Sequence, residues 1–483
     1  MSRMPRTYLR RLILLRANPS ERCNSINFEK VEFFVSMNAI RSAFMEIPVK
    51  RGLKHNCDQR STDSRCGVFR SCVKSSIINF FTIGSGGEVM ERVRLAVVVN
   101  GTGVGGAERM VGRVLTRLSP DEFDMKVFCL DSCGAVADQL EAAGIPVLGM
   151  DILKRRVPNP SDIVTLSREL KQFRPDVVQG WMYLSNLYGG FAAKLARRDC
   201  PVAWNIRHST IDAKIDSRSM RLTAWIGGKL SRLMPKKIVL CAEAAREAHC
   251  NVGYAPDRLQ VIPNGFDLSE FHPDPAARLR VRQELGLSDE VPLVGLMGRF
   301  HPHKDHRTFV RAARVIVDRV PNAHFLLVGA DQVFTTTDIW SWVDEVGLRD
   351  HFHLLKVRPD PAAIDASLDI SVCSSTTEGF PNVVGEAMAC GVPCVATNVG
   401  ECAEVVGDTG RIVSKQNSQQ LGDAIADILS LPRVDRVSLG QAARRRVCER
   451  YDIVQIVAQY RALWLELAGR TNSVADMPLR RAA

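Results

Sequence analysis

The stretch Val372–Thr397 constrains the fold of this chain more than any other, because it reads as strand, loop, helix and strand in direct succession. Ser374–Gly379 has the polar, glycine-containing composition of a loop, and Asn382 can cap a helix with apolar residues at helical spacing. Gly391 ends that helix, and Val392–Ala396 resumes as an apolar strand. Strands joined by a crossover helix lie parallel in one sheet. The stretch therefore predicts an open parallel α/β sheet.

Two glutamates frame this unit, Glu378 in the loop and Glu386 on the first turns of the helix. Ligands of open parallel sheets bind beyond the carboxyl ends of the strands, which is where both carboxylates are expected. Backbone N–H groups of Gly379, Phe380 and Asn382 stand at the start of the helix and favour a phosphate or a sugar hydroxyl. We therefore expect a binding site here, although a single glutamate in a loop is usually only solvated.

Strands and helices alternate along most of the chain, which predicts doubly wound domains. Ile262–Asp267 has turn chemistry after a short strand, and His272–Arg280 is expected to link two domains. Further helices are expected at 163–173 and 305–320, and a final one at 452–467. Strands are expected at Val93–Val99, Lys126–Leu130, Val177–Gln179, Val202–Ile206, Lys237–Cys241, Leu293–Met297, His324–Val328, His351–Leu355 and Asp369–Cys373.

A glycine-rich loop follows the first strand, a device for close backbone approach to an anionic ligand. Gly101, Gly103 and Gly106 satisfy the G-x-G-x-x-G pattern, and Asp131 follows the next strand. A nicotinamide-dependent Rossmann enzyme is therefore one alternative. The match by itself is weak.

The net charge of +11 is unevenly distributed, since residues 1–89 alone contribute +8. These residues show no sustained hydrophobic period, so we expect a poorly ordered basic extension. An alternative is that the native product begins at Met90, just before the first strand. Because most of the excess charge lies in this extension and the remaining chain carries only about +3, nucleic-acid binding is not expected.

Fourteen cysteines lie scattered without ladder spacing, as expected for reduced thiols in a cytosolic protein. No run of 18 uncharged apolar residues suggests a membrane span. His301 and His303 form an H-x-H pair but lack a third ligand nearby, so no metal site is expected.

The phrases EGFPN and EAMACGVP, with Glu378 and Glu386 in E-x7-E spacing, closely resemble the signature of family 4 retaining glycosyltransferases. IPNGFD resembles the phrase at which the first domain of these enzymes passes to the second. The resemblance covers roughly residues 93–430 and implies the GT-B fold, two Rossmann-like domains facing a cleft. We expect an extension over 1–89, an acceptor-side domain over 90–270, a nucleotide-sugar domain over 271–451, a returning helix over 452–470 and a tail over 471–483.

The resemblance also implies roles for individual residues. Arg299 and Lys304 match the basic pair that neutralises the donor pyrophosphate, so departure of the leaving group needs no metal. Glu386 would bind the ribose hydroxyls, and Glu378 would hold hydroxyls of the transferred sugar. His208, after the strand that ends at Ile206, matches a histidine that reaches the donor sugar and phosphate. The donor phosphate would take the acceptor proton, with retention of configuration.

Gly105 and Gly106 match a loop that faces the interdomain cleft in the resembled family. Leu184 departs from it, because a related segment often reads WMYH, so a histidine contact to the acceptor is not expected here. No cofactor is expected, since the nucleotide sugar, a UDP- or GDP-sugar, is a co-substrate. The acceptor would be a saccharide or lipid-linked saccharide, and a GT-B nucleotide-sugar epimerase remains an alternative.

The segment 217–242 carries several Lys and Arg side chains, no acidic residue and interleaved apolar residues. Such a segment can rest on anionic lipid and present a lipid-linked acceptor. We therefore expect a cytoplasmic enzyme, peripheral on the inner face of the plasma membrane. A solvated amphipathic helix is the alternative.

Overall fold

The computed structural model describes residues 91–103, 105–152, 160–213, 216–330 and 336–470. The predictions for the basic extension, its alternative start and the C-terminal tail lie outside the described residues. Within the described ranges, every helix is too short or too polar to cross a lipid bilayer.

The first sheet is seven-stranded and entirely parallel, in the order β3-β2-β1-β4-β5-β6-β7. This order reverses between β1 and β4, as expected for a doubly wound sheet. Buried apolar residues fill the central strands on both faces, which is typical of parallel sheets. The strands are β1 (Val93–Val99), β2 (Phe123–Cys129), β3 (Val147–Gly149), β4 (Val177–Trp181), β5 (Val202–Ile206), β6 (Lys237–Leu240) and β7 (Leu259–Val261).

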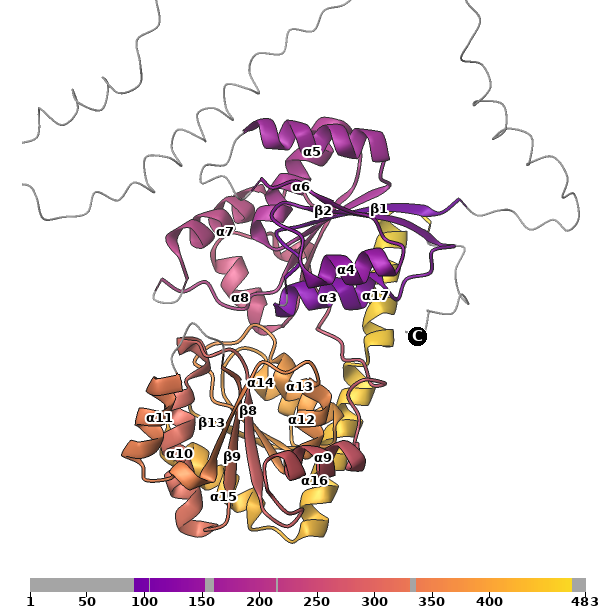
Figure 1. The fold of residues 1–483 in the computed structure, drawn as a ribbon. Helices are drawn as coiled ribbons and strands as arrows, with labels where there is room; N and C mark the ends of the chain where they lie inside the picture. The colour runs from indigo at the N-terminus through magenta and orange to yellow at the C-terminus, as the bar shows by residue number, and fades with distance from the viewer. Residues whose placement is uncertain (1–90, 104, 153–159, 214–215, 331–335, 471–483) are drawn as a thin grey trace, which may run out of the picture. The chain divides into compact units, whose positions relative to one another are not determined.

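Helices cover both faces of this sheet (Figure 1). One face packs against α3 (Gly106–Leu115), α4 (Ala135–Ala142) and α17 (Ile453–Leu467). The other face packs against α5 (Pro160–Phe173), α6 (Tyr183–Ala196), α7 (Arg218–Leu230) and α8 (Ala244–Asn251), with the short 3-10 helix η2 (Pro256–Arg258) before β7.

The second sheet is six-stranded, also parallel, in the order β10-β9-β8-β11-β12-β13. Its order again reverses once, between β8 and β11, so the predicted pair of Rossmann-like sheets is confirmed. The strands are β8 (Leu293–Met297), β9 (His324–Ala330), β10 (Phe352–Lys356), β11 (Ile370–Cys373), β12 (Cys394–Thr397) and β13 (Arg411–Val413).

Figure 1 shows α10, α11 and α15 on one side of this sheet and α9, α12 and α16 on the other. The first group comprises α10 (His306–Arg319), α11 (Thr336–Glu345) and α15 (Ser418–Leu429). The second face is covered by α9 (Pro275–Glu284), α12 (Pro361–Ser367), α13 (Asn382–Ala389), α14 (Cys402–Val406) and α16 (Arg433–Arg450). The 3-10 helices are η3 (Pro302–Lys304) and η4 (Arg349–His351).

Two local predictions were wrong. The expected linker His272–Arg280 is partly helical, because Asp274 caps α9 by accepting a hydrogen bond from the N–H of Ala277. The side chain of Asn382 does not cap α13. The cap position is Pro381, and Asn382 Oδ1 instead accepts a hydrogen bond from Asn264 at 2.6 Å.

The C-terminal helix α17 is bound to the first sheet through buried polar contacts as well as apolar packing. Tyr460 accepts a hydrogen bond from Asn205 Nδ2 at 2.7 Å, and Trp464 Nε1 donates to Gln179 Oε1 at 3.0 Å. Both donors and acceptors are buried. Each hydrogen bond therefore satisfies polar groups that would destabilise the fold if they were buried without a partner. The last helix therefore belongs to the core of the first sheet.

Asp365 on α12 is fully enclosed, and neither carboxylate oxygen has a hydrogen-bond partner among the described residues. Burial raises the pKa of Asp365 well above its usual range, and the nearby carboxylate of Glu386 raises it further. The folded protein therefore keeps this carboxyl protonated at a pH where the unfolded chain releases the proton.

We expect Asp365→Asn to stabilise the protein increasingly as pH rises. The unfolded carboxyl ionises above about pH 4 while the folded one stays neutral, so rising pH favours unfolding of the parent protein. The difference in Tm between variant and parent should grow between about pH 4 and about pH 7. Each kcal/mol of added stability raises the Tm by ~2–4 °C. The exposed Asp350→Asn is the control, and a pH-independent difference would contradict an enclosed neutral carboxyl.

Candidate functional site

A charged pair joins the loops that follow two adjacent strands of the second sheet. Lys304 Nζ, after β8, lies 2.6 Å from Glu378 Oε1, after β11. Burial alone would lower the pKa of Lys304, but the carboxylate beside it outweighs this effect and raises the pKa. The structure thus brings together two of the predicted site residues as a charged pair.

Backbone-directed hydrogen bonds fix the two loops against each other. Ser374 Oγ donates to the carbonyl oxygen of Lys304 at 2.7 Å, and the N–H of Thr376 donates to the carbonyl of His303 at 2.8 Å. Asp305 has a left-handed backbone and caps α10 by accepting from the N–H of Thr308. Lys304 therefore precedes a fixed helix start, and its ammonium group is held on Glu378.

The two oxygens of the Glu378 carboxylate have different surroundings. Oε1 accepts from Ser375 Oγ at 2.6 Å as well as from Lys304, and Cys373 Sγ lies 3.8 Å away. Oε2 has no hydrogen-bond partner among the described residues, and the side chain keeps 11% of its surface exposed. One oxygen thus anchors the carboxylate, and the other is available to a ligand.

Glu386 is nearly buried on α13 and forms its ion pair with a different element. Arg113 Nη2, on α3, donates to Glu386 Oε1 at 2.9 Å. Arg113 also donates to the carbonyl of Gly265 at 3.4 Å. The second predicted carboxylate is therefore paired with a cation that belongs to the helix after the glycine-rich loop.

The segment after β5 contacts the Glu378 loop through small groups. Ser209 Oγ donates to the carbonyl oxygen of Glu378. A Cβ at Gly379 would lie 3.0 Å from the carbonyl oxygen of Arg207 and 3.5 Å from the Cα of His208. Glycine thus allows the close approach of these two segments, which places the backbone of His208 beside the loop that carries Glu378.

The glycine-rich loop after β1 approaches the start of α13. A Cβ at Gly106 would lie 2.8 Å from Asn382 Nδ2. At Gly105 a Cβ would lie 2.2 Å from Glu108 Oε2, so this carboxylate folds back over the loop. Both glycines therefore lie where a larger residue would displace polar side chains near the predicted site.

Other predicted site groups are placed less directly. Arg299 is exposed and, among the described residues, makes no hydrogen bond or ion pair, so its guanidinium is free to bind an anion. The side chain of Phe380 is buried in an aromatic cluster with Phe266 and Tyr451, which leaves only its backbone for a ligand. The N–H of Asn382 donates to the carbonyl of Phe380 at 3.0 Å, so this predicted donor already has a partner within the loop.

Sequence reasoning missed the partners that hold the glutamates. Ser375 lies three residues before Glu378 in the same loop, so its short distance along the sequence could have suggested this hydrogen bond. Arg113 gave none, because its distance to Glu386 along the chain hides a contact that only folding creates. His301 Nδ1 accepts from the N–H of His303 at 3.2 Å. Within the described ranges, no His, Cys, Asp and Glu side chains cluster in threes as metal ligands.

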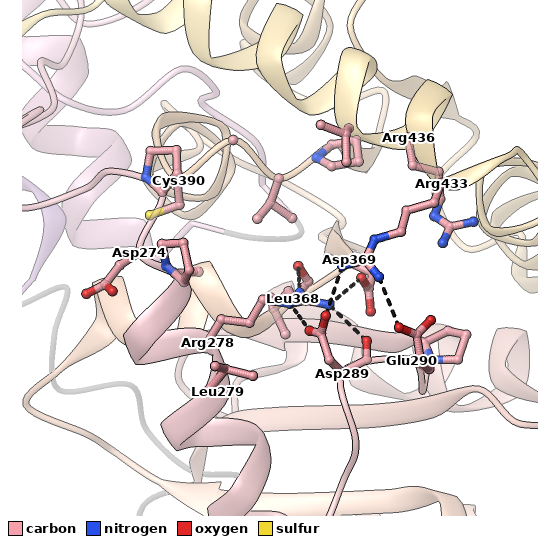
Figure 2. Close-up of a pocket in the computed structure, with 18 residues that line it drawn as sticks. Asp274, Arg278, Leu279, Asp289, Glu290, Leu368, Asp369, Cys390, Arg433 and Arg436 are labelled. Atoms are coloured by element: carbon pink, nitrogen blue, oxygen red, sulfur yellow. Dashed lines mark hydrogen bonds and ion pairs between the residues drawn. The ribbon is translucent and has the colours of Figure 1, made fainter.

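A cavity of about 380 Å³ lies at the opposite ends of the strands, where residues just before β8, β11 and β12 line it. Figure 2 shows Arg278 pointing toward Asp289 and Asp369, which it contacts at 2.6 and 2.9 Å. Arg433 also pairs with Asp289, at 2.9 Å. The charges in this cavity compensate one another, which indicates a structural ion-pair network.

Models of one enzyme family match both halves of the chain. A model described as Glycosyltransferase Family 4 matches residues 104–270, and one described as Glycosyl transferases group 1 matches residues 291–430. The chain belongs to the family 4 glycosyltransferases. This assignment confirms the sequence-based resemblance and favours a glycosyltransferase over the nicotinamide-dependent alternative.

Curated relatives of this glycosyltransferase are bacterial enzymes. The chain is 24% identical over 375 residues to the Escherichia coli UDP-Gal:alpha-D-GlcNAc-diphosphoundecaprenol alpha-1,3-galactosyltransferase, covering 75% of this chain and 94% of that protein. It is 32% identical over 197 residues to the Mycolicibacterium smegmatis GDP-mannose-dependent alpha-(1-6)-phosphatidylinositol monomannoside mannosyltransferase, covering 38% of this chain and 50% of that protein.

Solved structures show the same fold. Anabaena HepE in complex with UDP superposes with a TM-score of 0.68 at 21% identity, covering 77% of this chain and all of that one. The HepE complex with UDP-glucose gives a TM-score of 0.66 at 22% identity, with 78% of this chain covered. The predicted GT-B fold is confirmed.

We expect Lys304→Met to destabilise the glycosyltransferase by about 2–3 kcal/mol, because it leaves the nearly buried Glu378 carboxylate without its cation. Adding Glu378→Gln should recover part of this loss, since no charge then remains unpaired. Urea unfolding at neutral pH measures both free energies. The control is Arg314→Met, which breaks an exposed pair with Asp318 and should change stability by under about 0.5 kcal/mol. An equally unstable double variant would contradict the pairing.

Proposed function

We propose that this glycosyltransferase moves a sugar from a nucleotide-sugar donor to a saccharide or lipid-linked saccharide acceptor, with retention of anomeric configuration. The observation that carries the proposal is the Lys304–Glu378 pair, in which an ammonium group and a half-free carboxylate meet at the carboxyl ends of β8 and β11. The relatives named above, which use UDP-galactose or GDP-mannose by name, support a nucleotide-sugar donor.

In this proposal Glu378 binds hydroxyls of the transferred sugar through Oε2. Ser375 and Lys304 hold Oε1, so the carboxylate is oriented before the donor arrives. A carboxylate accepts hydrogen bonds only, which suits a row of sugar hydroxyls. Pre-orientation of this kind lowers the entropic cost of holding the anomeric carbon toward the acceptor.

Lys304 and Arg299 would neutralise the donor diphosphate. Lys304 brings a point charge, and the unpaired guanidinium of Arg299 can bind two phosphate oxygens. Negative charge grows on the diphosphate as its bond to the sugar breaks, and nearby cations stabilise that charge. The two side chains therefore assist departure of the nucleoside diphosphate.

Glu386 would accept hydrogen bonds from the ribose diol. The same carboxylate also pairs with Arg113, so the ribose and the arginine would share it. Only Oε1 of Glu386 contacts Arg113, at 2.9 Å. Binding of the nucleotide then requires no displacement of the arginine if the diol takes Oε2. The Arg113 guanidinium also places an opposite charge beside this nearly buried carboxylate.

The reaction breaks the bond between the anomeric carbon and the donor phosphate oxygen and forms one to the acceptor oxygen. The acceptor hydroxyl gives its proton to the departing phosphate, so charge and atoms balance without a protein nucleophile. Both bonds lie on the same face of the sugar, which retains configuration. His208, beside the Glu378 loop, would contact the donor sugar and phosphate.

We expect Glu386→Ala to weaken binding of the free nucleotide by about 10- to 100-fold, because it removes a charged hydrogen-bond acceptor from the ribose. Glu378→Gln is the matched variant. It should change the affinity for free UDP or GDP less than Glu386→Ala does, and lower the transfer rate by about 100-fold or more. Isothermal titration with UDP and GDP, and product formation from the corresponding sugars, measure the two effects. Unchanged nucleotide affinity in Glu386→Ala would contradict the ribose role.

The proposed acceptor surface includes α7 and the residues that follow it. Exposed cations at Arg218, Lys229 and Lys236 accompany Trp225 and Leu233, which are 49% and 78% exposed. This combination of positive charge with exposed apolar side chains fits an anionic bilayer surface, on which a lipid-linked acceptor would lie.

The structure narrows the set of cations that the sequence suggested for this surface. Arg221 is only half-exposed, and its Nε is buried without a partner among the described residues. Lys237 Nζ pairs with Glu466 at 3.6 Å. Arg232 remains exposed, although it lies 3.9 Å from Asp257. The membrane proposal therefore rests on Arg218, Lys229 and Lys236.

Reversing Arg218, Lys229 and Lys236 to Glu should lower binding to vesicles that contain phosphatidylglycerol by at least about tenfold. Each of these cations contributes attraction to an anionic surface, and reversal turns it into repulsion. Flotation at low and high salt measures the effect.

The matched control reverses Arg280, Lys356 and Lys415, which are exposed on the second half of the chain. It makes the same change in net charge and should leave flotation intact. Equal losses in both variants would show that net charge alone governs binding, and unchanged flotation of the first would end the membrane proposal.

A nucleotide-sugar epimerase of the same fold would give a different product. Incubation of a labelled donor with acceptor distinguishes the two activities, because transfer puts the label on the acceptor and epimerisation leaves it in a new nucleotide sugar. Label on the acceptor is the expected result.

A further inference from the structure

We infer that Asp216 is a positioning residue for His208, and this inference rests on the proposed role of His208 at the donor. His208 Nε2 and Asp216 Oδ1 lie 3.0 Å apart. The Asp216 side chain is 6% exposed and that of His208 is 27% exposed. The carboxylate is thus more deeply buried than the imidazole with which it is paired.

Asp216 is also held by hydrogen bonds to the backbone of Asp212. Its Oδ2 accepts from the N–H of Asp212 at 2.8 Å, and the N–H of Asp216 donates to the carbonyl of Asp212 at 2.8 Å. Both carboxylate oxygens therefore have defined partners. The backbone of Asp212 therefore holds Asp216 in addition to His208.

A second contact limits rotation of the His208 ring. The ring of Tyr183 meets it edge-on, with centroids 6.4 Å apart. Tyr183 donates its hydroxyl proton to His249 Nε2 at 2.8 Å, because His249 Nδ1 donates to the carbonyl of Ala245 at 2.7 Å. Burial lowers the pKa of His249 to about 4, so that ring stays neutral and keeps accepting. The Tyr183 ring is therefore held in place and packs against one side of the His208 imidazole.

These contacts decide which imidazole atom faces a ligand. A carboxylate only accepts, so Nε2 must carry a proton and donate it to Asp216. Among the described residues, Nδ1 of His208 has no hydrogen-bond partner. Nδ1 is therefore the ring nitrogen that remains available to a ligand, and the carboxylate at Nε2 fixes the tautomer and the orientation of the ring.

Kinetics of a double-mutant cycle test the inference. Asp216→Asn should lower kcat by about 10- to 100-fold with little change in the donor KM, since the ring is misoriented and not removed. On a His208→Gln background the same substitution should cost nothing further, because Asp216 acts through that ring. The matched control is Asp257→Asn, an exposed carboxylate of the same half that pairs with Arg232. Equal losses with and without His208, or full activity in Asp216→Asn, would overturn the inference.

A spectroscopic measurement needs no turnover and so separates this inference from the proposed function. In protein labelled with 15N-histidine, the resonances that disappear in His208→Gln belong to His208. The parent ring should carry its proton on Nε2, and Asp216→Asn should shift that resonance and populate the other tautomer. A parent ring without a proton on Nε2 overturns the inference. Loss of transfer with every donor, alongside an intact tautomer shift, would instead refute the proposed function alone.

Discussion

The contact on which this site depends is the ion pair between Lys304 and Glu378. Their elements, β8 and β11, are neighbours in the sheet, and parallel pairing puts both following loops at the same edge. The pair occupies one carboxylate oxygen, with Ser375 as a further donor, and leaves the other oxygen available. A single charged contact therefore ties the loops together and orients the group that is proposed to hold the sugar.

The two carboxylates and the imidazole of the proposed site are each held by an oppositely charged or hydrogen-bonding partner. Glu378 has Lys304, Glu386 has Arg113, and His208 has Asp216. Each pairing keeps a partly buried group in one orientation while leaving another of its polar atoms open. Desolvation makes an unpaired charge costly, so such partners also stabilise the fold around the site.

Much of the fold was predictable because the parallel strands are continuous apolar runs bounded by turn residues. The strands Val202–Ile206 and Leu293–Met297 were predicted to the residue. The helix at 275–284 was missed, because the proline of its first turn was interpreted as part of a linker, although Pro is favoured at a helix start. Asn382 was misassigned as a cap because its side chain has a distant partner, Asn264, that local rules cannot reveal.

The sequence by itself determined the family, the two Rossmann-like halves and the glutamates in E-x7-E spacing, because these depend on local patterns and short motifs. Only the tertiary structure decided how those groups are held. Arg113 and Glu386 are far apart in the chain, and the contact of Ser209 with the Glu378 loop joins different sheets. Such contacts arise from the packing of whole elements, whose relative positions no local periodicity encodes.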